Sequence, residues 1–245
     1  MRWGVFGDVH GNLQGLEAVL AALAGEGCDA LLCLGDVVGY GADPAACCAR
    51  LRDAGIPCLL GNHDQAMLAG SDLSWFNDHA RVALEWTRHQ LAPDEVAWLS
   101  GLEPTTCDEG FVAVHSSLPD PWRWDYVLTP AAAAATLSWA EENIVLVGHT
   151  HMAEGYGAGS GVRLARWSLP DGGELELAPG GRYVLNPGSC GQPRDRRWQA
   201  SYGVLDLTAR RFVVRRVPYE VGAAADRILW AGLPARLAAR LFEGR

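Results

Sequence analysis

The sequence contains no lysine, no CxxC pair of cysteines and no long hydrophobic run. All 20 of its basic residues are therefore arginine, which excludes a mechanism that needs a lysine Schiff base. No apolar stretch approaches the roughly 20 residues that a membrane-spanning helix requires. The apolar part of the opening segment MRWGVFGDVHGN is also too short for a signal sequence. We therefore expect a protein of the cytoplasm that engages no membrane.

Basic charge is also scarce relative to acidic charge. The net charge of −9 argues against a surface for long nucleic acid, because binding to the phosphate backbone needs clustered positive charge. The cysteines are odd in number and lie mostly in apolar surroundings, so we expect reduced thiols, mainly in the core. They are Cys28, Cys33, Cys47, Cys48, Cys58, Cys107 and Cys190.

What the chain does have is the composition of a globular protein. Its 245 residues are 49% hydrophobic and 20% charged, and we expect a single domain over residues 1–245. Two βαβ units open the chain, because helical periodicity in NLQGLEAVLAALAGEG and in DPAACCARLRDAG separates short apolar runs. These units predict a parallel sheet covered by helices.

The rest of the chain alternates helical and extended patterns. Residues 65 to about 108 are predicted to be a helical insertion of two helices broken at Pro93. The glycine-rich span 156–182 predicts a hairpin with loose turns. Strands follow after Arg182, and a C-terminal helix is expected at about 222–243.

Five short apolar runs end in polar residues, and these runs are predicted to be strands. Their ends carry Asp8, Asp36, Asn62, His115 and His149. Ligands of α/β sheets bind beyond the carboxyl ends of the strands, so these side chains are expected to meet at one sheet margin. In extended backbone, residues two apart point to the same side, which lets Asp8 and His10 converge and likewise lets His149 and His151 converge.

The resulting donor set points to metal binding. Singly, an aspartate after a strand is often a turn or helix cap, and a lone histidine is often structural, which is how we interpret His79 and His89 on a predicted helix. Together, however, the donors are too many for one tetrahedral ion and sufficient for two. Because no thiolate is among them, Mn, Fe, Co or Zn is expected. The donors are Asp8, His10, Asp36, Asn62, His115, His149 and His151.

The same segments resemble a known family. GDVHGN, LGDVVG, GNHD, the VH at 114–115 and VGHTH are similar to the five signature blocks of the calcineurin-like metallophosphoesterase superfamily, in the same order, across residues 7–151. LNPGSCGQPRDRRWQASYGVLD and the C-terminal stretch are similar to its bacterial predicted-phosphodiesterase branch, which includes proteins that resemble asymmetric diadenosine tetraphosphate hydrolases.

The resemblance implies an α/β fold, a two-sheet β-sandwich flanked by helices in four αββα layers, with a dinuclear site at one edge. Two divalent metal ions per chain are implied, and Asp36 would bridge them. A water shared by the two cations, with its pKa lowered from 15.7 toward ~7, would be the nucleophile. One ion would be held by Asp8, His10, Asp36 and His151, and the other by Asp36, Asn62, His115 and His149.

The resemblance also implies catalytic residues. His63 would protonate the departing oxygen and Asp64 would hold its ring in orientation, although a structural hydrogen bond from His63 to the turn is the alternative. Two departures from the family pattern are visible. Ser116 follows His115 where glycine is common, and Tyr40 lies near the place of the arginine found in protein phosphatases and symmetric dinucleotide hydrolases, which argues against those subclasses.

Substrate contacts are predicted from composition near these motifs. Trp122 and Trp124 could stack on a nucleobase, or simply pack in the core. Arg194, with Arg196 nearby, could contact phosphate oxygens, or could form a solvated turn. Asn62 and Tyr40 are further candidates for substrate contact.

These observations together predict a phosphodiesterase that acts on small diesters or nucleotide polyphosphates, with a small phosphorylated substrate as its partner. An asymmetric diadenosine tetraphosphate hydrolase or a phosphomonoesterase is the alternative within the same class. A metal-binding scaffold without turnover is the alternative of a different class. His63 and Asp64 favour the enzyme, because scaffold relatives usually lack the acid. Oligomeric state is not predicted.

Overall fold

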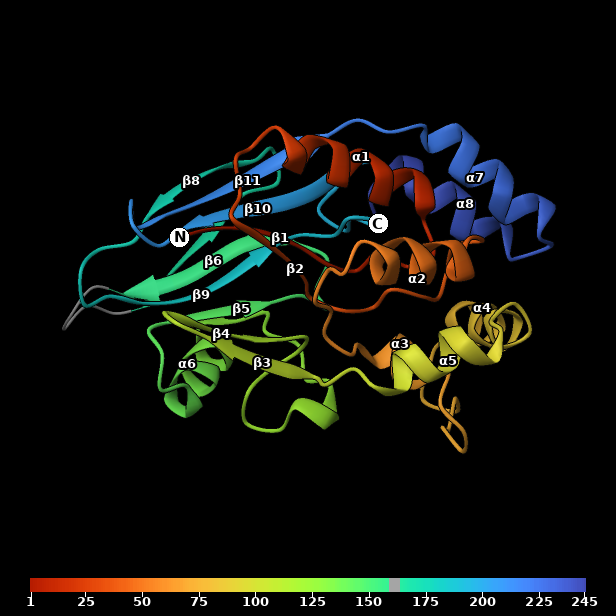
Figure 1. Ribbon diagram of the computed structural model, residues 1–245, viewed down its shortest axis with the longest axis horizontal. Helices are drawn as coiled ribbons and strands as arrows, with labels where there is room; N and C mark the ends of the chain where they lie inside the picture. Colours follow the sequence, from red (N-terminus) through yellow and green to blue (C-terminus); the bar gives the residue numbers. More distant parts are fainter. Residues whose placement is uncertain (159–163) are drawn as a thin grey trace.

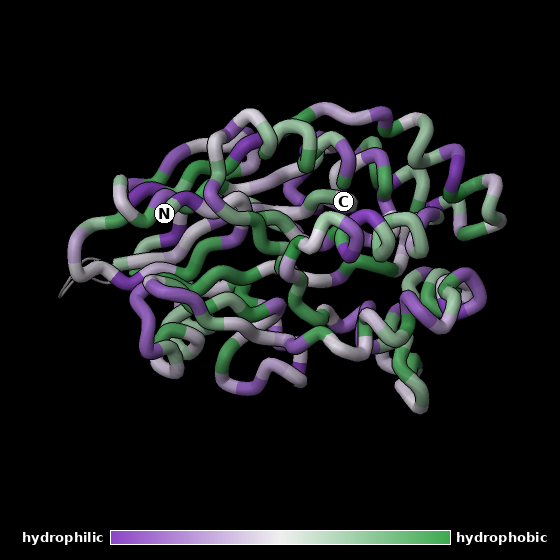
Figure 2. Tube along the Cα trace, viewed as in Figure 1, coloured by the Kyte–Doolittle hydropathy of each residue, from purple (hydrophilic) through white to green (hydrophobic). Residues whose placement is uncertain are grey.

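The fold is described from a computed structural model for residues 1–158 and 164–245. Two β-sheets lie face to face, and helices cover the outer side of each (Figure 1). Figure 2 shows hydrophobic stretches along several strands between the layers, and a mixture of hydrophobic and hydrophilic stretches along the helices that flank them. The four-layer αββα architecture expected from the sequence is therefore confirmed.

The first sheet combines the N-terminal strands with strands from the end of the chain. Its order is β2–β1–β10–β11–β8. Only β1 and β2 are parallel, because β10 returns antiparallel to β1 and the remaining pairs are also antiparallel. The strands are β1 (Arg2–Phe6), β2 (Ala30–Cys33), β8 (Gly173–Glu176), β10 (Ala200–Asp206) and β11 (Arg211–Val217).

The second sheet has the order β3–β4–β5–β9–β6–β7. Its centre is parallel, since β4, β5 and β9 run in one direction, and its edges are antiparallel. The parallel centre brings the ends of β4 and β5 to the same margin. The strands are β3 (Thr105–Asp108), β4 (Phe111–Val114), β5 (Ile144–Val147), β6 (Ala153–Ala158), β7 (Ala165–Ser168) and β9 (Arg182–Pro187).

Three hydrophobic clusters hold the layers together. Between the sheets, Val5 and Leu146 belong to one cluster that buries inward-facing residues of both sheets. Outside the first sheet, a larger cluster includes residues of α1 (Leu13–Ala24), α2 (Pro44–Asp53), α7 (Val221–Trp230) and α8 (Ala235–Glu243). Outside the second sheet, α6 (Pro130–Trp139) packs through the third cluster. Burial of these apolar faces is the main driving force for the layered arrangement.

The helical insertion is largely as predicted, with one exception at its end. Short α3 (Asn62–Gln65) is followed by α4 (Asp78–Arg88) and α5 (Pro93–Ser100), and the break before Pro93 is confirmed. The last part of the predicted insertion, however, is the edge strand β3.

The C-terminal helix expected at about 222–243 is two helices, α7 and α8. Gly232 has a φ of +71° and Pro234 immediately precedes α8, so the backbone turns between two segments that share one amphipathic pattern.

Two predicted extended segments also differ from expectation. The run IPCLLG makes only a single parallel bridge, between Cys33 and Cys58, and is no regular strand. The predicted hairpin is formed by β6 and β7, but β8 leaves it and pairs with β11 in the other sheet. Residues 159–163 of this span lie outside the described residues.

All seven cysteines are free thiols, and most are buried or half-buried, but Cys107 is exposed, contrary to a core position. Within residues 1–158 and 164–245, no helix is both long and apolar enough to cross a membrane.

Candidate metal centre

The predicted donors meet where the carboxyl ends of strands from both sheets lie side by side. Asp8 and Asp36 follow β1 and β2 in the first sheet, whereas His115 and His149 follow β4 and β5 in the second. The two halves are joined directly, because the His149 backbone N–H donates to Asp8 Oδ1 over 3.1 Å. The expectation of a single sheet margin was thus too simple: the site lies at the junction of the two margins.

The backbone at these donors is not extended. Five of the predicted ligands adopt left-handed conformations, which cost roughly 1–2 kcal/mol each for residues other than glycine. Asp8 and His10 do converge, as do His149 and His151, but not because residues two apart point to the same side of an extended strand. Strain of this kind persists only where surrounding structure compensates it, and it clusters at functional sites. The φ angles are 51° for Asp8, 51° for His10, 52° for Asp36, 65° for His149 and 60° for His151.

Six of the seven predicted ligands form two overlapping groups. Within each group, one nitrogen or oxygen atom per residue lies within 4.8 Å of the corresponding atoms of the others, and every member is buried. Asp36 belongs to both groups. The first group is Asp8, His10, Asp36 and His151, and the second is Asp36, His115 and His149.

Each of the four imidazoles has one ring nitrogen committed to a backbone carbonyl. A carbonyl can only accept, so that nitrogen carries the proton and the other nitrogen presents a lone pair. Three rings use Nδ1 and one uses Nε2, which fixes the side from which a cation would be bound. The bonds run from His10 Nδ1 to Val38 O (3.0 Å), from His115 Nδ1 to Leu34 O (2.7 Å), from His151 Nδ1 to Gln192 O (2.6 Å) and from His149 Nε2 to Trp124 O (2.9 Å).

This hydrogen bonding fits a cation better than protein groups alone. His10 Nε2 and His151 Nε2 are 3.0 Å apart, and neither carries a proton in the tautomer that its carbonyl imposes. Among the described residues, Asp8 Oδ2, Asn62 Oδ1 and His115 Nε2 are buried atoms without a hydrogen-bond partner. Buried polar atoms are normally satisfied, and Asp8 and His115 also belong to the ligand groups, so their free atoms suit an ion.

Charge leads to the same conclusion. Burial raises the pKa of Asp8 to about 7, with a contribution from nearby Asp36. Burial lowers the pKa of His149 to about 3, and the charge of His115 lowers it further. Burial opposes protonation of His115 too, but Asp36 outweighs it and raises the pKa of His115 to about 9. Without a metal, a proton on His115 neutralises Asp36, and a divalent cation would take over that role.

Asp36 is held so that one oxygen faces both groups. Its Oδ1 accepts the backbone N–H of His63 over 2.8 Å. Its Oδ2 lies 3.5 Å from His10 Nε2 and 3.4 Å from His115 Nε2. Gly61 permits this approach, since a Cβ there would lie 2.1 Å from Asp36 Oδ1. The same turn delivers Asn62, the seventh predicted ligand, whose amide oxygen is buried beside the site.

His63 lies against the first group, as expected for a residue that acts beside the metals. Its ring centroid is 4.7 Å from that of His10, 4.5 Å from that of Tyr40 and 5.1 Å from that of Phe76. Gly39 closes the remaining side, because a Cβ there would lie 2.2 Å from His63 Nδ1. Burial lowers the pKa of His63 to about 4, despite the opposing charge of Asp36. Packing, then, holds this ring.

Asp64 makes other contacts than the expected one to the His63 ring. Its Oδ1 accepts the backbone N–H of Val38 over 3.0 Å, and its Oδ2 accepts the backbone N–H of Gly61 over 3.0 Å. Among the described residues, no hydrogen bond joins it to the His63 ring. Asp64 therefore ties the loop after β2 to the start of α3, and so positions the backbone that carries Asp36 and His63.

The tryptophan-rich segment divides into a buried and an exposed part. Trp124 is only 4% exposed, its indole N–H donates to Gln65 Oε1 over 2.9 Å, and its carbonyl holds His149. Stacking of a nucleobase on Trp124 is thus excluded by burial. Trp122 is 50% exposed. Tyr126, 47% exposed, lies parallel to the His149 ring with centroids 4.0 Å apart. Trp122 and Tyr126 remain available to a ligand.

The tyrosine in the loop after β2 contacts two arginines, one of which the sequence did not indicate. Tyr40 is 5% exposed, and the guanidinium carbons of Arg194 and Arg240 lie 5.9 Å and 5.5 Å from its ring centroid. Arg240 belongs to α8, far from the five donor motifs in sequence, and no local pattern singles it out. Arg196, by contrast, is exposed.

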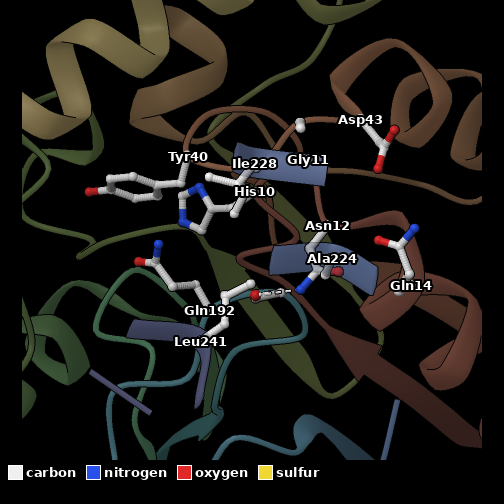
Figure 3. A pocket seen from close by; sticks show the side chains of 13 residues that line it. His10, Gly11, Asn12, Gln14, Tyr40, Asp43, Gln192, Ala224, Ile228 and Leu241 are labelled. Atoms are coloured by element: carbon white, nitrogen blue, oxygen red, sulfur yellow. Dashed lines mark hydrogen bonds between the residues drawn. The ribbon is translucent and has the colours of Figure 1, made fainter. Parts of the chain in front are cut away.

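A small cavity of about 10 Å³, room for one water molecule, lies between this corner and the C-terminal helices. In Figure 3 the rings of His10 and Tyr40 lie side by side at its edge, and Gln192 reaches the same corner. Ile228 of α7 and Leu241 of α8 also line the cavity, and Figure 3 shows Ile228 beside His10 and Leu241 beside Gln192. The helices at the end of the chain therefore pack directly against the site.

Comparisons with known proteins agree with this geometry. Residues 1–210 match the family model described as the calcineurin-like phosphoesterase superfamily domain. A metallophosphoesterase from Sphaerobacter thermophilus is similar in structure, with a TM-score of 0.87 and 34% identity over 100% of this chain and 99% of that one. Hypothetical protein PH1004 from Pyrococcus horikoshii shares the fold, with a TM-score of 0.80, 20% identity and coverage of 100% and 98%. The uncharacterized protein MJ0912 of Methanocaldococcus jannaschii is 32% identical over 98% of this chain and 97% of its own length.

Proposed function

This chain belongs to the calcineurin-like phosphoesterase superfamily and is a hydrolytic enzyme of the metallophosphoesterase type, and on that premise we propose that it cleaves small phosphodiesters or nucleotide polyphosphates. The observation that carries the proposal is the pair of buried ligand groups that share Asp36. Two metal sites with a common carboxylate suit displacement at phosphorus, where charge builds on both the attacking and the leaving oxygen.

The protein groups divide the work between binding and proton transfer. Two divalent cations of the Mn, Fe, Co or Zn type would neutralise the phosphoryl oxygens and make a water molecule acidic near neutral pH. The four imidazoles that donate to backbone carbonyls would bind these cations through their other ring nitrogen, which already has a free lone pair. Asn62 adds a neutral oxygen, so the ligand set gains no third carboxylate.

His63 is the group available to act on the leaving oxygen. It lies beside the first ligand group, and its own ring nitrogens take no part in either group. We propose that it donates a proton or a hydrogen bond to the departing oxygen, which geometry beside the ligands supports. Asp64 acts indirectly, through the backbone that it ties together.

The surroundings favour a small substrate. The net charge of −9 disfavours long nucleic acid. Exposed Trp122 and Tyr126 next to the site offer aromatic faces on which a base could stack. A dinucleoside polyphosphate that is cut asymmetrically is small and carries bases that could stack on these faces. A phosphomonoester is the second candidate, but it gives the exposed aromatic faces no role.

A scaffold that binds metals without turnover is the competing proposal of a different class. The buried His63 ring argues against it, because a scaffold needs the ligands but not an imidazole held beside them whose Nδ1 has no hydrogen-bond partner in the described part of the chain.

The deciding experiment uses the purified chain with added Mn²⁺ against bis(p-nitrophenyl) phosphate, p-nitrophenyl phosphate and diadenosine tetraphosphate. We expect hydrolysis that stops with chelator and in Asp36→Asn, with the diester or the dinucleotide preferred over the monoester. Absence of hydrolysis of all three, with two metals bound per chain, would support the scaffold.

A further inference from the structure

The corner formed by Tyr40, Arg194 and Arg240, here named the arginine corner, is assembled from three distant parts of the chain. Tyr40 follows β2, Arg194 lies between β9 and β10, and Arg240 lies on α8. The Tyr40 ring is in contact with the imidazoles of His10 and His63, at centroid distances of 4.7 Å and 4.5 Å. One side of the tyrosine therefore faces the metal centre, and the arginines lie over the same ring.

Neither guanidinium group forms an ion pair with an Asp or Glu side chain of the described residues, and their hydrogen bonds go to neutral side chains or to the main chain. Arg194 Nη2 donates to the Tyr40 hydroxyl over 3.4 Å and to Gln192 Oε1 over 3.2 Å, and both acceptors are neutral. Arg194 Nε is buried and has no hydrogen-bond partner in residues 1–158 and 164–245. The Nε of Arg240 donates to the backbone oxygen of Arg245. Two like charges thus lie together, partly shielded from water, with donors left over.

Two neighbouring guanidinium groups that are partly shielded from water repel each other, and a bound anion would offset this repulsion. Burial lowers the pKa of Arg240, and the neighbouring charge of Arg194 lowers it further. Two neighbouring arginines are paired: Arg236 on α8 with Glu243, and Arg197 in the β9–β10 loop with Asp171. Arg194 and Arg240, by contrast, have no Asp or Glu side chain as partner among residues 1–158 and 164–245, although the chain has an excess of acidic residues.

The chemistry of the corner suits phosphate oxygens. Guanidinium groups present planar pairs of N–H donors that match them, and the bonds are charge-assisted. Tyr40 contacts the ligand imidazole of His10, and both guanidinium carbons lie within 5.9 Å of the same ring, so an anion bound at the corner would lie next to a group bound at the metal centre.

From this geometry we infer that the arginine corner binds a second phosphoryl group of the substrate, adjacent to the one that is cleaved, and that the substrate class is therefore polyphosphorylated, as in a nucleoside polyphosphate. This inference rests on the proposed function for the identity of the cleaved group, but the binding of a polyphosphate at the corner can be measured without any turnover.

The test measures by calorimetry, at constant ionic strength, how tightly inorganic tripolyphosphate binds to the metal-free chain. Orthophosphate, which has a single phosphoryl group, is the comparison ligand. Arg194→Gln and Arg240→Gln should each weaken tripolyphosphate binding by about tenfold or more, as loss of a charge-assisted hydrogen bond predicts. The matched controls are Arg196→Gln in the same loop and Arg236→Gln on the same helix, which should bind as the wild type does. Should Arg240→Gln fail to fold, Arg240→Lys keeps the charge but loses the planar pair of donors, and should show an intermediate loss.

Tripolyphosphate affinity within twofold of wild type in both arginine variants would overturn the inference. So would an equal loss of orthophosphate affinity, because that result assigns the arginines to the reacting phosphoryl group. If the two arginine variants lose tripolyphosphate binding but the wild-type protein hydrolyses no phosphate ester, the result supports binding at the arginine corner and refutes the proposed function. The two proposals can therefore fail separately.

Discussion

His10 Nε2 and His151 Nε2 lie 3.0 Å apart although 141 residues separate them, and each ring donates its Nδ1 proton to a backbone carbonyl. Two unprotonated nitrogens facing each other at that distance repel, so the folded protein holds an arrangement that a cation relieves. Metal binding and folding stability are coupled through this contact.

Added Mn²⁺ should therefore stabilise the metal-free chain. At a concentration about 100 times its dissociation constant, a ligand that binds only the folded state contributes about 2.7 kcal/mol, which corresponds to roughly 2–4 °C in Tm for each kcal/mol. Thermal unfolding with and without Mn²⁺ measures the shift. His151→Ala should abolish it, whereas His79→Ala, an exposed histidine of α4, should retain it. A full shift in His151→Ala would contradict the ligand assignment.

Asp36→Asn should reduce metal content below two per chain and lower activity with it. The amide can still accept the His63 N–H through its oxygen, so the local hydrogen bond survives while the shared negative charge is lost. Metal analysis after gel filtration gives the stoichiometry, and Asp53→Asn, on the exposed end of α2, is the control. Retention of two metals by Asp36→Asn would exclude Asp36 as the bridge.

His63→Ala should keep both metals and lower kcat by roughly 10²–10⁴, as the loss of a group that protonates the leaving oxygen predicts. Steady-state rates on a diester, with metal analysis on the same sample, test this, and His89→Ala at the end of α4 serves as control. Unchanged turnover would refute the role of His63, and loss of metal would make it structural.

Gly39→Ala should displace the His63 ring, because the new Cβ would lie 2.2 Å from Nδ1. Gly39 has a φ of +90°, so the substitution also strains the backbone. Gly55→Ala is the matched control, since Gly55 has a φ of +63° but a Cβ added there would meet nothing within 4 Å. Both variants should lose about 1–2 kcal/mol of stability from the backbone. Only Gly39→Ala should lose kcat with its metals retained, and equal activities would show that Gly39 does not position His63.

Trp122→Ala and Trp124→Ala should have opposite phenotypes. Trp124 is buried, and its truncation should destabilise the protein by about 3–5 kcal/mol, as for large core residues. Trp122 is half exposed, so its truncation should leave Tm nearly unchanged but raise KM for a dinucleotide more than KM for a small aryl diester. An equal change in the two KM values would remove Trp122 from substrate binding.

Much of the fold was accessible from local patterns. The apolar periodicity of α1 and α2, the break at Pro93 and the apolar runs of β1, β2, β4 and β5 all depend on neighbouring residues, and all were predicted. The errors lie where a long-range contact overrides the local pattern. The run before Asn62 has the composition of a strand but makes one bridge. The C-terminal error differs, because Gly232 and Pro234 are local signals for the turn that the continuous amphipathic pattern masked.

By itself the sequence determined which donors this protein offers to metals and in what order, because each donor sits in a short motif beside the apolar run that delivers it. The tertiary structure decided how they are used: which nitrogen of each imidazole faces inward, that Asp64 holds backbone instead of His63, that Trp124 is buried while Trp122 is exposed, and that Arg240 reaches Tyr40. Those properties depend on hydrogen-bond partners and neighbours contributed by distant segments, which no local pattern encodes.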